Sequence, residues 1–250
     1  MKEVPVTETQ IPAASALGVT KVFGFGETAV TALDDVSVSF EQGKFSAIMG
    51  PSGSGKSTLL HCLAGLDRVT DGQVLIGDVD LTGLNDKRLT QLRRDKIGFV
   101  FQAFNLVPTL NARENITLPM DIAGRKPDAE WLNHVIEILT LGDRLTHKPT
   151  ELSGGQQQRV AAARALAGRP EIIFADEPSG NLDSKSGTQL LRFMKQAVED
   201  YGQTIVMVTH DPLAAAHSER VVFLEDGKIA GDMLDPTAER ILDRIKTLEG

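Results

Sequence analysis

The sequence contains one cysteine, Cys62, among its 250 residues. A single cysteine excludes a disulfide within the chain, and it excludes a zinc site built from several thiolates. We expect Cys62 to be a buried residue on a helix, because free cysteine behaves as a small apolar side chain. The scarcity of cysteine is compatible with a reducing cytoplasm.

Long hydrophobic runs are also missing. The longest, such as 172–175 and 221–224, have the length of strands, whereas a helix needs about 20 apolar residues to cross a bilayer. The first ten residues, MKEVPVTETQ, have mixed charge and no apolar segment, which is not the pattern of a secretory signal. We expect residues 1–16 to form a flexible tail.

Basic residues are fewer than acidic residues. The 26 Lys and Arg residues are outnumbered by 34 Asp and Glu residues, which gives a net charge of −8. Because a nucleic-acid-binding surface normally needs a basic face, this balance argues against nucleic acid as a partner. It still permits a nucleotide pocket, since a small site can be locally basic within an acidic protein.

The residues that are present suit a globular α/β domain. Hydrophobic residues make up 41% of the chain, which is enough to bury a core. Short apolar runs alternate with amphipathic helical patterns, and this predicts a largely parallel sheet. The expected strands are 36–40, 45–49, 97–101, 172–175, 205–208 and 221–224. Strand signals fade between about 103 and 159, where we expect a helical subdomain.

A glycine-rich segment after the expected strand 45–49 matches the phosphate-binding pattern G-x-x-x-x-G-K-[ST]. Its residues are Gly50, Pro51, Ser52, Gly53, Ser54, Gly55, Lys56, Ser57 and Thr58. Glycines let backbone N–H groups approach phosphate oxygens, and the expected helix from Lys56 directs its positive end at the anion. Lys56 is placed to reach the β- and γ-phosphates, and the Ser57 hydroxyl is placed to bind Mg²⁺. The segment therefore predicts a nucleotide site.

Two adjacent carboxylates, Asp176 and Glu177, follow the expected strand 172–175. Ligands commonly bind at the carboxyl ends of parallel strands. We expect Asp176 to hold Mg²⁺. Successive strand residues point in opposite directions, so Glu177 would face elsewhere and accept a proton from the attacking water.

A third motif is the most discriminating. The sequence Leu152-Ser153-Gly154-Gly155-Gln156 precedes an expected helix that runs to about Ala167. Ser153 is a suitable N-cap, and the backbone amides that follow it form a second anion site.

Together these motifs resemble the nucleotide-binding subunits of ABC transporters, over roughly residues 17–235. The resemblance implies a P-loop NTPase (RecA-like) core with an antiparallel β subdomain and an inserted helical signature subdomain, followed by a C-terminal helix at 236–250. It implies that Gln102 links Mg²⁺ and the attacking water to the helical subdomain, and that His210 contacts the γ-phosphate and Glu177. The loop Ser179–Asp183 would cross a dimer interface, so that Asp183 and the Ser153–Gln156 signature serve the nucleotide. The remaining histidines, His61 among them, are expected to be structural.

The family usually stacks an aromatic side chain on adenine some distance before the phosphate-binding loop. Phe23 fits this position, and Phe25 is the competing candidate. Either ring can stack on a base, although phenylalanine lacks the hydroxyl of the more common tyrosine.

A narrower resemblance rests on Phe101–Leu110 and on the segment from Ser179 to Gly187. It points to the branch of the macrolide exporter MacB and the lipoprotein-releasing ATPase LolD; Ser179 departs from the threonine common there. This implies a second copy of the chain, ATP, and a four-helix permease that docks near Phe104–Leu110 and moves a hydrophobic peptide, lipoprotein or haem-like cargo. The chain would then lie on the cytoplasmic face of the membrane. Two alternatives stay open: a force-transmitting regulator like the cell-division ATPase FtsE, and a soluble ABC ATPase acting on nucleic acid.

Overall fold

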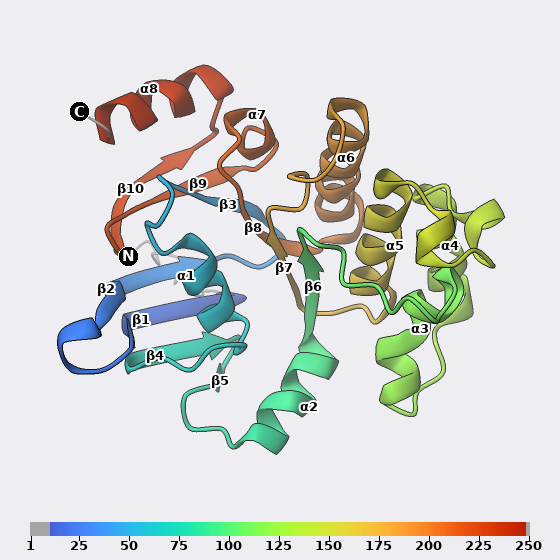
Figure 1. Ribbon diagram of the computed structural model, residues 1–250, viewed down its shortest axis with the longest axis horizontal. Coiled ribbons are helices and arrows are strands. Elements are labelled where there is room, and N and C mark those ends of the chain that lie inside the picture. The colour runs from blue at the N-terminus through green and yellow to red at the C-terminus, as the bar shows by residue number, and fades with distance from the viewer. Residues whose placement is uncertain (1–10, 249–250) are drawn as a thin grey trace, which may run out of the picture.

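The computed structural model describes residues 11–248 (Figure 1). Most of the expected tail at 1–16 lies outside the described residues. The prediction that the tail extends to residue 16 is wrong. Strand β1 (Ala14–Phe23) already begins at Ala14, which pairs with Phe40 and Ile76. Ala14 and Ala16 are fully buried, so the apolar face of this strand requires an ordered chain.

Residues 11–248 form two sheets, of which one is antiparallel and has the order β2-β1-β4-β5. Its other strands are β2 (Val30–Phe40), β4 (Asp71–Ile76) and β5 (Val79–Asp80). The predicted strand 36–40 is the end of the longer β2, which continues back to Val30 through its pairing with β1. This sheet is the predicted antiparallel β subdomain.

The second sheet has the order β10-β9-β3-β8-β7-β6, and all neighbours except β10 and β9 are parallel. Its strands are β3 (Phe45–Met49), β6 (Ile97–Phe101), β7 (Ile172–Asp176), β8 (Thr204–Val208), β9 (Arg220–Glu225) and β10 (Lys228–Leu234). Every residue of β3 and β8 is buried, as expected for central strands covered on both faces. Because parallel strands end at a common edge, Gly50, Gln102, Glu177 and His210 are carried to one side of this sheet.

Helix α1 (Lys56–Leu63) separates the two sheets (Figure 1). Leu59, Leu60, Cys62 and Leu63 are buried between Ile48 and Phe174 of the parallel sheet and the inner face of the antiparallel sheet. Cys62 is therefore a core residue, as predicted, and burial raises the pKa of its thiol to about 11. The helix that follows the phosphate-binding loop is thus fixed by apolar contacts on two sides.

The other face of the parallel sheet is covered by helices, which Figure 1 shows on the far side of β6 and β7 from α1. These are α3 (Ala112–Ile122), α4 (Ala129–Ile138), α5 (Gly154–Ala167) and α6 (Ser184–Tyr201). Shorter or peripheral helices are α2 (Asp86–Lys96), α7 (Pro212–Ala215) and α8 (Ala238–Leu248). Residues 103–159, all of them described, contain helices and turns without a strand, as predicted.

Helix α4 reaches α6 through the only tryptophan and the only tyrosine of the sequence. The Trp131 ring meets Tyr201 edge-on, with centroids 5.3 Å apart, and His134 bonds to the Tyr201 hydroxyl. The Trp131 indole N–H donates to the carbonyl oxygen of Leu166 on α5 (3.0 Å). The aromatic contact therefore joins the inserted helical region to the end of α6.

Candidate functional site

The loop between β3 and α1 is shaped by glycines that no other residue could replace without distortion. A Cβ atom on Gly50 would lie 1.9 Å from the carbonyl oxygen of Leu224, and one on Gly55 would lie 2.4 Å from that of Ala32. Gly50, Gly53 and Gly55 all have positive φ. Backbone atoms of β2 and β9 therefore leave no room for a side chain at Gly50 or Gly55.

Side chains of this loop are distributed over its two faces. Ser52 and Gly53 are exposed, whereas Ser54 is buried and its hydroxyl has no hydrogen-bond partner among the described residues. The Lys56 ammonium donates to the carbonyl oxygen of Pro51 (2.7 Å). Burial lowers the pKa of Lys56, and the negative charges of Glu177 and Asp176 oppose that shift. The lysine is thus held at the loop, facing the two carboxylates.

Asp176 ends β7 next to the first turns of α1. The Ser57 hydroxyl donates to Oδ1 of Asp176 (3.0 Å), so two of the residues predicted to hold magnesium lie side by side. Thr58 follows on the same helix and is partly buried. The other carboxylate oxygen, Oδ2, lies 3.4 Å from Nε2 of His61. The hydrogen-bonding contact with Asp176 raises the pKa of His61, against the opposing effect of burial.

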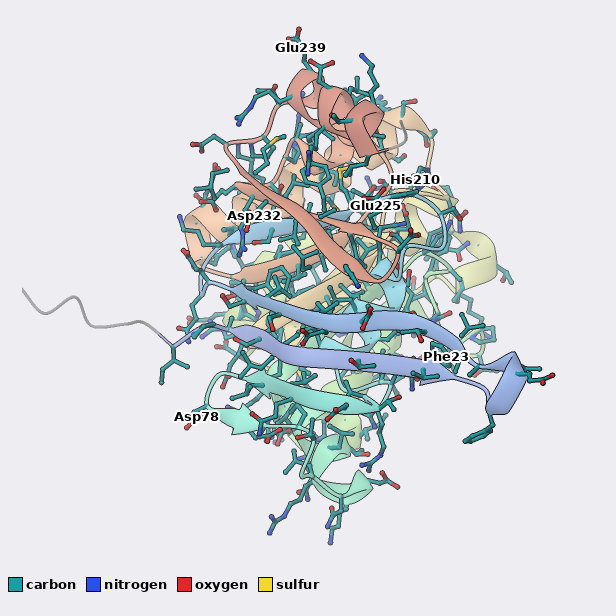
Figure 2. The ribbon with its side chains drawn as sticks, turned by 90° about the vertical axis from the view of Figure 1, so that its left-hand side faces the viewer. Phe23, Asp78, His210, Glu225, Asp232 and Glu239 are labelled. Carbon is teal, nitrogen blue, oxygen red and sulfur yellow. The ribbon has the colours of Figure 1, made fainter. Side chains whose placement is uncertain are left out.

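Glu177 is the next residue, and its backbone leaves the strand in a left-handed conformation with φ +46°. Its side chain is only 17% exposed, and its Oε1 lies 2.8 Å from Nδ1 of His210, which is 72% exposed. The two residues predicted to act as base and switch are therefore in direct contact. Figure 2 shows His210 and Phe23 toward the same side of the molecule, opposite Asp78.

Gln102 and the loop 179–183 form a second group of contacts. The Asn181 amide donates to the backbone oxygen of Gln102 (2.9 Å), and a Cβ atom on Gly180 would lie 3.0 Å from the Gln102 amide nitrogen. Asp183 caps α6 by accepting from the N–H groups of Lys185 and Ser186, and these Ser186 contacts lower the pKa of Asp183. The Asp183 carboxylate is thus occupied by its own helix.

The signature segment begins α5. Ser153 and Gln156 form a capping box, in which Gln156 N–H donates to Ser153 Oγ (3.3 Å) and Ser153 N–H donates to Gln156 Oε1 (2.9 Å). Gly154 lies near the Phe104 ring, and a Cβ atom on Gly155 would lie 2.6 Å from the Ser186 hydroxyl. Figure 1 shows α5 and α1 on opposite sides of the parallel sheet. The chain therefore does not bring its own signature to its own phosphate-binding loop.

The two candidates for the adenine contact differ in exposure. Phe23 ends β1, is 43% exposed, and has the Lys21 ammonium 4.6 Å from its ring centroid. Phe25 lies at the hairpin tip and is 93% exposed. Phe23 is therefore the more buried of the two rings, and it is the one with a cation over its face.

Several residues that contact the site were missed by sequence reasoning. His61 was expected to be structural, although its position four residues after Ser57 places both on one face of α1. Gln158 donates to the carbonyl oxygen of Pro178 (2.7 Å), and Arg164 donates to those of Phe104 and Asn105 (2.9 and 2.6 Å). Their partners are backbone atoms distant in sequence, so no local pattern could have identified these contacts.

Within residues 11–248, no helix is both long enough and apolar enough to cross a bilayer. The chain matches the family model described as ABC transporter over residues 33–180. It is 47% identical over 217 residues to the uncharacterized ABC transporter ATP-binding protein MJ0796 of Methanocaldococcus jannaschii, covering 84% of this chain and 92% of that protein.

It is 44% identical to the macrolide export ATP-binding/permease protein MacB of Burkholderia pseudomallei, covering 88% of this chain but only 34% of MacB. A solved structure of MJ0796, a dimer in a post-hydrolysis state bound to ADP and Pi, superimposes with a TM-score of 0.82 and 43% identity, over 89% of this chain and 98% of that one. The P-loop NTPase fold is therefore shared along nearly the whole chain. The chain belongs to the ABC transporter family and is one of its ATPase cassettes.

Proposed function

We propose that two copies of this chain close around two ATP molecules and drive a membrane permease of the MacB and LolD branch, which exports or extracts a hydrophobic cargo. The observation that carries the proposal is the convergence of Lys56, Asp176, Glu177 and His210 at one edge of the parallel sheet. This edge supplies an anion-binding loop and a base side by side. Both are needed to split the terminal phosphate of a nucleotide.

In the proposed reaction, the phosphates of ATP lie on the N–H groups of the loop, with Lys56 beside them. Glu177 accepts a proton as water oxygen bonds to the γ-phosphorus and the bond to the ADP oxygen breaks. His210 holds Oε1 of Glu177 and so fixes the direction of the carboxylate. Gln102, exposed at the end of β6, would orient the water.

The residues present fit a magnesium ion. The lone pairs of Ser57 Oγ are free for a cation while its proton is donated to Asp176 Oδ1. A hydroxyl and a carboxylate, completed by phosphate and water oxygens, form the ligand set that Mg²⁺ prefers. When bound, the ion would neutralise charge on the phosphates, with Gln102 as a further oxygen donor.

A second copy would complete each site. Ser153 is exposed at the N-terminus of α5, where N–H groups and the helix dipole favour an anion, yet α5 is separated from α1 of the same chain (Figure 1). A partner's signature could supply this positive end to the γ-phosphate. The loop 179–183, which Asp183 ends by capping α6, would lie at the interface between the two copies. The dimer of the similar cassette MJ0796 supports this arrangement.

The permease contact is proposed at Phe104–Leu110, a loop that contains both half-buried and exposed residues. Phe104 and Leu106 are half-buried and Leu106 packs on the core, while Pro108 and Thr109 are exposed. A groove beside the loop, about 390 Å³, is lined by apolar side chains such as Phe99, Phe101 and Pro119 and by the charged side chains of Arg93, Arg94, Asp95 and Arg164. Such a groove suits a short helix of a permease. A permease of this kind would hold the chain at the cytoplasmic face of the membrane.

The similarity to MacB, whose printed name combines an ATP-binding part with a permease, favours this reading, and the chain spans about a third of MacB. To test it, the tagged chain is purified from solubilised membranes of its source cell, and co-purifying proteins are identified by mass spectrometry. A four-helix permease with a large extracytoplasmic domain is the expected partner. Recovery of ribosomes or nucleic acid without any membrane protein would overturn the proposal, and a cell-wall regulator would favour the FtsE-like alternative.

A further inference from the structure

The Asp176 carboxylate is held by two side chains of the same helix. Ser57 and His61 are four residues apart on α1, so they lie one turn apart on one face. Ser57 Oγ donates to Oδ1 (3.0 Å), and His61 Nε2 lies 3.4 Å from Oδ2. Each carboxylate oxygen therefore has its own neighbour, and rotation about the Cβ–Cγ bond would break both contacts.

The His61 ring is itself held in place. Its side chain is 32% exposed, and its centroid lies 6.0 Å from that of Phe99 on the neighbouring strand β6. Leu60 and Cys62, the adjacent residues of α1, are buried in the core. A ring supported in this way can orient the oxygen that it faces.

We propose that His61 is a positioning residue for the magnesium site. It keeps Oδ2 of Asp176 engaged, so that Oδ1 stays beside Ser57 Oγ and both can face the cation. The inference rests on the proposed magnesium site. Partners that orient a ligating carboxylate are generally important, and their loss costs about 10–100-fold in metal affinity or activity.

If His61 had a purely structural role, its removal would have a different effect from the one expected of a positioning residue. In that case, removing the ring would loosen the packing of α1 and, through the helix, the phosphate-binding loop that precedes it. ATP binding without any metal would then weaken together with metal binding. A positioning role predicts that metal affinity alone changes, because the loop amides and Lys56 do not depend on Asp176 Oδ2.

The test uses the full chain with Glu177→Gln, so that ATP persists, and measures Mn²⁺ binding to the ATP complex by electron paramagnetic resonance. His61→Leu is expected to weaken Mn²⁺ binding about 10-fold. His61→Gln should recover most of the affinity, because its amide nitrogen can occupy the place of Nε2. His134→Leu removes another helical histidine, on α4, and should leave Mn²⁺ binding unchanged. ATP affinity measured in EDTA should be the same in all variants.

Unchanged Mn²⁺ affinity in His61→Leu would overturn the inference, as would an equal loss of ATP affinity in EDTA or a failure of His61→Gln to recover binding. Asp176→Asn distinguishes a failure of the His61 role from a failure of the magnesium site itself. If Asp176→Asn weakens Mn²⁺ binding while His61→Leu does not, only the role of His61 fails. If Asp176→Asn also has no effect, the proposed magnesium site fails with it.

Discussion

Glu177 combines an unfavourable backbone conformation with a central position in the site. A left-handed φ costs a residue with a side chain roughly 1–2 kcal/mol, and Glu177 adopts it directly after β7. In this conformation, Oε1 of Glu177 lies 2.8 Å from Nδ1 of His210. The conformation is therefore tied to the placement of the proposed base.

We predict that Glu177→Gln binds ATP but hydrolyses it about 10²–10⁴-fold more slowly, because the amide cannot accept the proton. The ATP-bound dimer should accumulate. Single-turnover phosphate release and size-exclusion chromatography with ATP measure the two effects. Wild-type turnover in this variant would remove Glu177 from the catalytic role.

The second prediction at this scale concerns the base of the nucleotide. Phe23→Ala should weaken ATP binding by about 0.5–1.5 kcal/mol beyond the lost contact area, whereas Phe23→Tyr or Phe23→Trp should be tolerated. Phe25→Ala is the matched control, since that ring is almost fully exposed. Titration calorimetry with a non-hydrolysable ATP analogue gives the values. A larger loss in Phe25→Ala would reverse the assignment.

The candidate site could be predicted from sequence where chemistry depends on contiguous residues. The loop 50–58, the pair Asp176–Glu177 and the 152–156 motif each have a local pattern. His61 could not be recognised, because its contact with Asp176 forms only when β7, far along the sequence, packs beside α1. The same is true of Asn181, whose amide reaches the backbone of Gln102.

At the scale of elements, the strands β3, β6, β7, β8 and β9 of the parallel sheet were predicted to within one residue at each end. Continuous apolar runs such as 45–49 and 205–208 mark where such buried strands begin and end. Strand β1 was missed. Its pairing with β2 has register shifts between Ala16 and Val22, so its inward and outward residues do not alternate regularly. Where pairing is irregular, apolar and polar residues do not alternate along the sequence, and strand prediction depends on that alternation.

The loop between β6 and α3 contains the proposed permease contact, Phe104–Leu110, which can be tested by substitution. Pro108→Glu and Thr109→Glu place charge on the exposed part of the loop, so we expect a permease to stimulate hydrolysis less in these variants, while ATP binding is kept. Thr247→Glu is the matched control, because Thr247 is exposed on α8, a helix that Figure 1 shows far from α3 and β6. ATPase assays with the reconstituted permease measure the stimulation. Full stimulation of the loop variants would place the contact elsewhere.

At the scale of the whole molecule, the separation of α1 from α5 makes the dimer testable by complementation. Lys56→Ala damages the phosphate-binding loop and Ser153→Arg damages the signature, so each homodimer has two defective sites. If the signature acts on the partner's nucleotide, a mixed dimer has one site with both defects and one site with none. We therefore expect mixing to restore nucleotide binding at one site and some hydrolysis.

Occupancy is measured together with rate, because one intact site could close the dimer without fast turnover. A signature that acts within its own chain would leave one defect in every site, and mixing would restore nothing. Verified mixed dimers without an intact site by either measure would contradict the shared-site arrangement.

The contact of Trp131 with Tyr201 gives the molecule a built-in optical probe. Since the chain has no other tryptophan, selective excitation of the indole reports on a single place, where α4 of the inserted helical region meets the end of α6. Rotation of that region relative to the parallel sheet would change the surroundings of the ring and hence its emission. Stopped-flow fluorescence on mixing with ATP would therefore time this movement without any added label.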